Sequence, residues 1–264
     1  MIFLHISDIH FLREYKKEEE GYNSIFNNMT NPIDQIKKLM SKVNKDKLDF
    51  IIITGDLVEG GNSEDYKELK KNLDKIFEGI PYIVTLGNHD NKAEFYKGWF
   101  NEDLGNKPYN TTMTIGDIKI ISFDNSEYHN PNGFIDSDRC KWLREELKKD
   151  NDKNVILMLH HHLLKEQFNL PPASYDNEFE EIIKNSSIIA IFSGHTHHPY
   201  KGEFMGKPYF TSGSLSFVGY NEEDGRVRFE EASKCNLCTY KENNINVEVI
   251  EVTDENKLLT YVRF

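Results

Sequence analysis

Short stretches of this chain place carboxylate, imidazole and amide side chains at spacings suited to metal binding and proton transfer. The densest stretch is Leu86-Gly87-Asn88-His89-Asp90. Asn88 offers a side-chain carbonyl to a hard cation, His89 can exchange a proton near neutral pH, and Asp90 is placed to fix the tautomer of His89. Gly87 lacks a Cβ and permits a sharp turn. Taken alone, the stretch also suits a strand-to-helix turn capped by Asn88 or Asp90.

Further ligand-type side chains follow other predicted strands. Asp8 and His10 are two residues apart, as are His195 and His197, so each pair projects to one side of an extended segment. In open α/β sheets, ligands bind outside the carboxyl ends of the strands. A core or capping role explains any one of these groups, but it does not easily explain all of them. We therefore predict one shared site that contains Asp8, His10, Asp56, Asn88, His160, His195 and His197.

The elements that would carry these residues alternate between strand and helix. Apolar runs predict strands at 1–7, 49–54, 81–85, 155–159 and 188–192, and a hairpin at 109–123. Helical spacing predicts helices at 33–43, 63–77, 136–149 and 179–183, with Asn31 and Ser63 as caps of the first two. This alternation is typical of βαβ units and a mainly parallel sheet.

The pattern changes after Tyr209, where strands follow one another without helices at 209–212, 214–218, 227–231, 247–252 and 258–262. These strands predict a second, antiparallel sheet or a sheet edge. With no clear linker or repeat, we expect a single domain over 1–264 with two packed sheets and a β-rich part from about 207–264. The polar segment 11–30 is long for a structureless connection, and it suits a lid over a site and a solvated excursion equally well.

Composition narrows the class of protein. The 264 residues carry a formal net charge of −12, which argues against generic binding of nucleic acid. Only three cysteines occur, so we do not expect a disulfide framework. We expect a reducing, cytoplasmic location instead. Cys235 and Cys238 have the spacing of half a zinc site, but we favour surface thiols. We expect neither a membrane span nor a secretory signal.

The ordered set of motifs resembles the calcineurin-like metallophosphoesterase family. The chain reads Asp8-Ile9-His10, Gly55-Asp56, Gly87-Asn88-His89-Asp90, His160 and Gly194-His195-Thr196-His197, and the resemblance runs to about residue 215. Each motif alone is weak, whereas the five in order are specific. The resemblance implies an α/β fold of two packed mixed β-sheets flanked by helices, a four-layer αββα sandwich, with a binuclear metal centre.

The resemblance also implies a role for each residue. One metal ion would be held by Asp8, His10, Asp56 and His197, and the other by Asp56, Asn88, His160 and His195. We expect Mn and/or Fe, with Zn, Co and Ni as alternatives. A hydroxide bridging the ions would attack phosphorus, His89 would protonate the leaving group, and Asp90 would orient His89. We expect His161 to line the pocket and His162 to lie at the surface.

The substrate is narrowed by two weaker matches. The stretches Phe123-Asp124-Asn125-Ser126 and Gly133-Phe134-Ile135-Asp136 resemble the cyclic-nucleotide phosphodiesterase-like subgroup. A small phosphodiester, with a 3′,5′-cyclic nucleotide as one candidate, is therefore the leading substrate. Phosphomonoesterase activity on small phosphorylated metabolites or phosphoproteins is the alternative, ahead of a nuclease or a non-catalytic scaffold. The sequence leaves the oligomeric state open.

Overall fold

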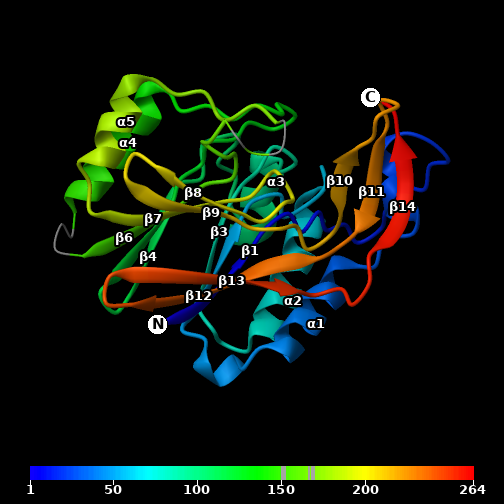
Figure 1. Ribbon diagram of the computed structural model, residues 1–264, viewed down its shortest axis with the longest axis horizontal. Helices are drawn as coiled ribbons and strands as arrows, with labels where there is room; N and C mark the ends of the chain where they lie inside the picture. Colours follow the sequence, from blue (N-terminus) through cyan, green and yellow to red (C-terminus); the bar gives the residue numbers. More distant parts are fainter. Residues whose placement is uncertain (150–152, 166, 168–169) are drawn as a thin grey trace.

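The computed structural model describes residues 1–149, 153–165, 167 and 170–264. Its first sheet has five strands in the order β13-β12-β1-β2-β3 (Figure 1). β1, β2 and β3 are mutually parallel, and β12 joins β1 in the antiparallel sense. The bounds of these strands are Ile2–Ile6 for β1, Phe50–Thr54 for β2, Tyr82–Thr85 for β3, Lys234–Lys241 for β12 and Asn244–Glu251 for β13.

The second sheet has six strands in the order β4-β5-β6-β7-β9-β8. The neighbours β5, β6, β7 and β9 are parallel, whereas the edge strands β4 and β8 are antiparallel to their partners. The bounds are Thr111–Ile115 for β4, Ile118–Ser122 for β5, Asn154–Met158 for β6, Ile188–Ser193 for β7, Tyr200–Phe204 for β8 and Lys207–Thr211 for β9.

The two sheets pack face to face, and helices cover their outer faces (Figure 1). The rings of Phe3 and Phe50 stack at 4.5 Å in the first sheet, and Phe192 of the second sheet meets Phe3 edge-on. α1 (Pro32–Lys42) and α2 (Ser63–Phe77) cover the first sheet, and α4 (Ser137–Lys148) and α5 (Asn177–Lys184) cover the second. The predicted four-layer αββα architecture is confirmed.

The starts of the first two helices show how local sequence sets the elements. Asn31 caps α1, as predicted, by accepting a hydrogen bond from the backbone N–H of Ile33. The cap of α2 is Asn62 rather than Ser63, because Asn62 and Asp65 form a reciprocal capping box. Beyond β3 the chain forms a short α3 (Lys92–Phe95) that continues into a π-helical turn, η3, over Tyr96–Phe100.

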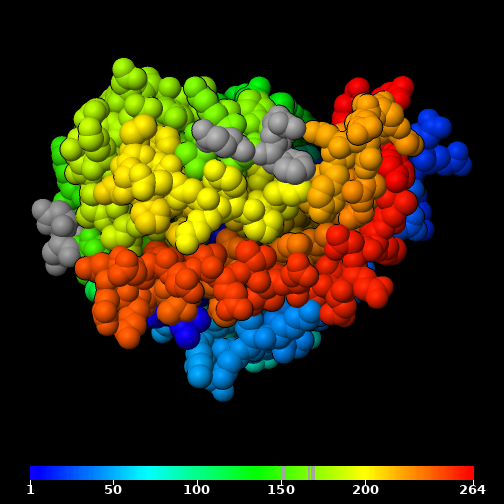
Figure 2. Space-filling model, in the orientation of Figure 1, coloured from blue at the N-terminus to red at the C-terminus, as the bar shows by residue number. Residues whose placement is uncertain are grey.

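A third, three-stranded sheet stands at one end of the molecule. Its strands are β10 (Val218–Asn221), β11 (Val227–Glu231) and β14 (Lys257–Val262) in that order. The 3₁₀ turn η1 (Tyr22–Asn27) within the polar 11–30 segment packs on it, and a second 3₁₀ turn, η2, spans Lys45–Lys47. Figure 2 shows this end in orange and red, with blue N-terminal residues beside it.

Two predictions for the C-terminal part are wrong. Residues 214–217 lie outside the strands, and the strand β12 is missing from the sequence-based prediction. β12 is an inner strand between β1 and β13, and core clusters pack on both faces of this sheet. Cys235 and Cys238 are therefore buried rather than at the surface, and they lie in different core clusters. Side chains three apart on a strand point to opposite faces, so the pair does not form half of a zinc site.

Candidate metal centre

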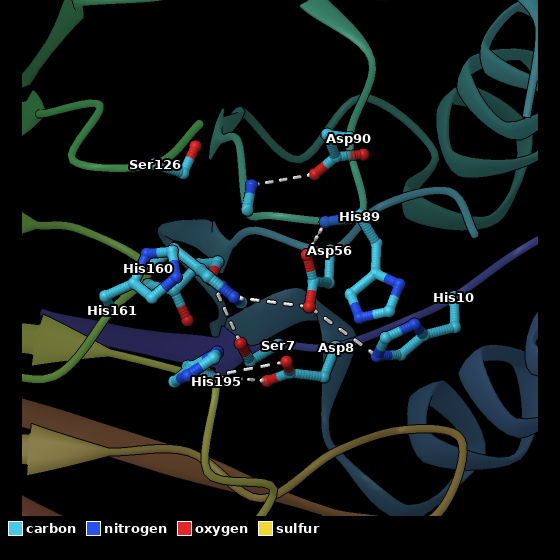
Figure 3. A network of polar contacts seen from close by, with 12 residues as sticks. Ser7, Asp8, His10, Asp56, His89, Asp90, Ser126, His160, His161 and His195 are labelled. Atoms are coloured by element: carbon cyan, nitrogen blue, oxygen red, sulfur yellow. Dashed lines mark hydrogen bonds and ion pairs between the residues drawn. The ribbon is translucent and has the colours of Figure 1, made fainter. Parts of the chain in front are cut away.

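The predicted ligands meet at the carboxyl ends of five strands, three in the first sheet and two in the second. Asp8 and His10 follow β1, Asp56 follows β2, and Asn88 follows β3 in the first sheet. The second sheet contributes His160, which follows β6, and the pair His195 and His197, which follows β7. Figure 3 shows the Asp56 carboxylate between the imidazoles of His10 and His160, with His195 facing Asp8. The two sheets therefore supply ligands from opposite sides of one site.

The backbone at this site is strained. Five non-glycine residues of the predicted set have positive φ, between 48° and 72°. This left-handed region is sparsely populated by residues with a Cβ and costs free energy that the surrounding structure must offset. Its concentration at candidate ligands is typical of a functional site. The five residues are Asp8, His10, Asp56, His195 and His197.

One cluster of ligand atoms matches the first predicted metal site. The Nε2 atoms of His10 and His197 are 3.2 Å apart, and the Nε2 of His197 is 3.3 Å from Oδ1 of Asp8. The Nε2 of His10 lies 3.7 Å from Oδ2 of Asp56. One ligand atom from each of these four residues lies within 4.8 Å of the others. The arrangement of two carboxylates and two imidazoles suits a divalent transition metal.

The second cluster lies on the other side of Asp56. Oδ2 of Asp56 is 3.2 Å from the Nε2 of His160, and ligand atoms of His160, His161 and His195 lie within 4.8 Å of one another. Oδ1 of Asn88 is buried and has no hydrogen-bond partner among the described residues. Because a buried carbonyl without a partner is costly, this amide fits a role as a metal ligand. The residues thus fit two ions that share Asp56.

Hydrogen bonds at the opposite ring nitrogens orient the imidazoles. Such contacts fix the tautomer and leave Nε2 as the ligand atom. Nδ1 of His10 lies 2.5 Å from Oε2 of Glu59. Nδ1 of His160 lies 2.7 Å from the carbonyl oxygen of Thr54, and Nδ1 of His197 lies 2.7 Å from that of Phe217.

Gly87 is required because neighbouring atoms are close, and its φ is not in the left-handed region. A Cβ at this position would lie 2.1 Å from Oδ1 of Asp56. The predicted turn is present, since the backbone N–H of Asp90 donates to the carbonyl of Gly87 at 3.2 Å, and close approach of the β3 loop to the shared carboxylate adds a second reason for glycine. The same approach lets the backbone N–H of His89 donate a 2.9 Å hydrogen bond to Oδ1 of Asp56.

Glu59 is a functional candidate that the motif analysis missed. Its Oε1 lies 2.8 Å from Nδ1 of His89, and its Oε2 pairs with His10, so one carboxylate joins the two imidazoles. Burial lowers the pKa of His89, but the carboxylates of Asp56 and Glu59 outweigh it and raise that pKa to about 10. These two carboxylates therefore favour the protonated form of His89, the form that can donate a proton. The one available signal was a carboxylate three residues beyond Asp56.

The predicted contact between Asp90 and the His89 ring does not form. The Asp90 carboxylate accepts hydrogen bonds from the backbone N–H groups of Gly87, Leu57 and Val58, and from the hydroxyl of Tyr66. In Figure 3 it points away from the imidazole of His89. Asp90 ties the β2 and β3 loops together, and Glu59 is the carboxylate that orients the ring.

Asn125 holds the segment that presents His160. Its Oδ1 accepts from the backbone N–H groups of His160 and His161, and its Nδ2 donates to the carbonyl of His161. The adjacent Asp124 forms a buried ion pair with Lys92 at 2.6 Å. The stretch 123–126 that resembles the phosphodiesterase-like subgroup thus contacts the backbone that carries the second cluster.

The triplet after β6 differs from expectation at its second and third members. His161 is buried against His195, with ring centroids 4.3 Å apart, and it does not line the pocket that His195 lines. His162 is also buried, not exposed, and its Nε2 lies 3.2 Å from the carbonyl of Leu170. The backbone N–H of Ala173 also donates to the carbonyl of His162 at 2.8 Å, and these contacts left no pattern in the sequence.

Comparison with known proteins gives one family. The sequence model described as "Calcineurin-like phosphoesterase" matches residues 1–199. A probable glycerophosphodiester phosphodiesterase GpdQ of Arcobacter nitrofigilis is 31% identical over 75% of this chain and 72% of its own length. A probable cyclic nucleotide phosphodiesterase of Rhodococcus erythropolis is 28% identical over 72% of this chain, and the match spans 65% of that relative.

The fold is also found among solved structures. The purple acid phosphatase PPD1 of yellow lupin superposes on 96% of this chain with a TM-score of 0.64 at 13% identity, and the match covers 52% of that chain. At this level of identity the similarity concerns the fold alone. Within the described residues, no helix has the length and apolar character needed to cross a membrane.

Proposed function

The chain belongs to the calcineurin-like phosphoesterase family, a family of phosphoric ester hydrolases, and from this premise we propose that it is a metal-dependent phosphodiesterase acting on a small phosphodiester. The observation that carries the proposal is the position of Asp56 between two ligand clusters. A 3′,5′-cyclic nucleotide and a glycerophosphodiester are the two candidate substrates, since relatives bear both names.

Seven side chains would hold the metal ions. Bound ions would supply Lewis acidity towards the phosphoryl oxygens and lower the pKa of a bound water. We propose Mn and/or Fe, because mixed carboxylate, imidazole and amide ligands suit these ions. One ion would be held by Asp8, His10, Asp56 and His197, and the other by Asp56, Asn88, His160 and His195.

His89 is the residue that would act as the general acid. Its Nδ1 is bound to Glu59, and the ring lines the pocket next to the metal centre. The positive charge that Asp56 and Glu59 favour on His89 stabilises the phosphate in the ground state and allows a proton to pass to the leaving alkoxide. This proton transfer matters most for poor leaving groups.

A screen under added Mn²⁺ tests the proposal. Cyclic nucleotides, glycerophosphodiesters, mononucleotides and sugar phosphates would each be incubated with the purified protein, and alcohol or phosphate release measured. Turnover of a diester in preference to the monoesters supports the proposal. Turnover of monoesters alone would replace it with a phosphomonoesterase.

A further inference from the structure

A pocket of about 490 Å³ opens beside the metal centre, and its two sides differ in chemistry. The inner side is formed by Asn88, His89, His195 and His197. The outer side is aromatic, and we call it the aromatic wall; it consists of Tyr22, Phe217, Phe229 and Phe264. Among the described residues, the pocket is lined by no Lys, Arg, Asp or Glu side chain.

The aromatic wall is built by the segments whose roles the sequence left open. Tyr22 comes from η1, Phe229 from β11 and Phe264 from the residues after β14. η1 is fastened to β14 by a 3.0 Å hydrogen bond between the hydroxyls of Ser24 and Thr260. The polar 11–30 segment and the third sheet therefore form one unit, which Figure 1 shows at the right of the molecule. Its aromatic side chains line the same pocket as His89.

The wall is in contact with the reactive groups. The ring of Tyr22 stacks on His89 at a centroid distance of 6.0 Å and an interplanar angle of 24°. Phe217 lies 4.8 Å from the ring of His197 and 5.0 Å from that of His10. A phosphate held at the metal centre would therefore place one of its ester groups against these aromatic rings.

We infer that the aromatic wall selects a diester of a single phosphate whose ester group is uncharged and carries a planar ring, such as a nucleoside. Aromatic side chains bind planar rings by stacking and by burial of apolar surface. A second phosphate placed against the aromatic wall would lose its hydration, and no Lys or Arg side chain among the described residues lines the pocket to pair with it. The inference rests on the proposed phosphodiesterase function and adds the chemistry of the ester group.

A cationic head group is the competing occupant of an aromatic site. The lining of this pocket argues against it, because no Asp or Glu side chain among the described residues lines the pocket to balance the charge of a quaternary ammonium group.

The test compares substrates that differ only in the ring. Cyclic AMP is paired with a 3′,5′-cyclic ribose phosphate that carries a methoxy group in place of the base, and glycerophosphocholine forms a third arm. With Mn²⁺ present, we expect kcat/KM to be at least about tenfold higher for cyclic AMP than for the baseless analogue, in line with the contribution of one stacked base. Equal values for the pair, or a preference for glycerophosphocholine, would overturn the inference while leaving the phosphodiesterase function intact.

A variant at the pocket rim provides an independent test. Phe264 is 81% exposed, so Phe264→Ala is compatible with folding, and Tyr261→Ala removes an exposed ring of β14 that does not line the pocket. We expect Phe264→Ala to raise KM for cyclic AMP severalfold, with kcat and the baseless analogue unaffected, and Tyr261→Ala to change neither. An equal effect of Phe264→Ala on both substrates would contradict the inference that the aromatic wall binds the planar ring. If bis-p-nitrophenyl phosphate is not hydrolysed either, the proposed function itself has failed.

Discussion

The Nδ1 atom of His89 lies 2.8 Å from Oε1 of Glu59, and the other oxygen of that carboxylate pairs with Nδ1 of His10. A predicted proton donor and a predicted metal ligand are thus held by the same side chain. The loop after β2 thereby couples the orientation of the acid to that of the metal centre.

Replacing His89 should separate metal binding from proton transfer. We expect His89→Ala to keep its metal ions and to lose about 10²–10⁴-fold in kcat on substrates with alkoxide leaving groups. The loss should be smaller with bis-p-nitrophenyl phosphate, because p-nitrophenolate leaves without protonation. Steady-state kinetics on the two substrates check this, and equal losses on both would count against the general-acid role.

Removing the negative charge of Glu59 should reproduce part of that behaviour. Partners that orient metal ligands typically contribute 10–100-fold to activity or metal affinity, so we expect Glu59→Gln to lose about that much. The loss should again be larger for an alkoxide leaving group. Glu68→Gln is a suitable control, since the Glu68 side chain is 38% exposed on α2. A Glu59→Gln variant that matches the parent protein would show that the contact has no catalytic role.

The two neighbouring histidines after β6 should differ in metal content. We predict that His160→Ala binds one ion fewer per chain, because the Nε2 of His160 lies 3.2 Å from the shared Asp56 carboxylate. His161→Ala should retain both ions. Elemental analysis of the two variants decides between them, and loss of an ion from His161→Ala alone would transfer the ligand role to His161.

The buried His5 should make the metal-free protein less stable in acid. Burial is the main cause that lowers the pKa of His5 to about 3, against 6.5 when unfolded. Between these values the unfolded chain binds a proton that the folded chain does not, so stability falls as pH decreases from 6.5 towards 3. His5→Gln should reduce the slope of unfolding free energy against pH by up to about 1.4 kcal/mol per unit. Urea unfolding at several pH values measures the slope, and identical slopes would refute the assignment.

The parts of this structure that were predictable from sequence depend on local pattern. Strand ends such as Asp56 and His160 were found because buried apolar runs stop at them, and parallel strands bring their ends together. Asn31 was found because a cap followed by Pro is a local signal.

The parts that were missed depend on distant contacts. The burial of Cys235 follows from insertion of β12 beside β1, more than 200 residues away in sequence. Glu59 contacts His89 only because Gly87 lets two loops approach closely. The aromatic wall joins Tyr22 to Phe229 across almost the whole chain. None of these pairings has a periodic signature in the sequence.

The central claim is that this chain hydrolyses phosphodiesters with two metal ions that share Asp56. Titration of chelator-treated protein with Mn²⁺, while hydrolysis of bis-p-nitrophenyl phosphate is followed, tests it most directly. We predict no hydrolysis without metal and an activity that saturates at two bound ions per chain. Absence of hydrolysis at every Mn²⁺ concentration, or full activity in the metal-free protein, would contradict the claim.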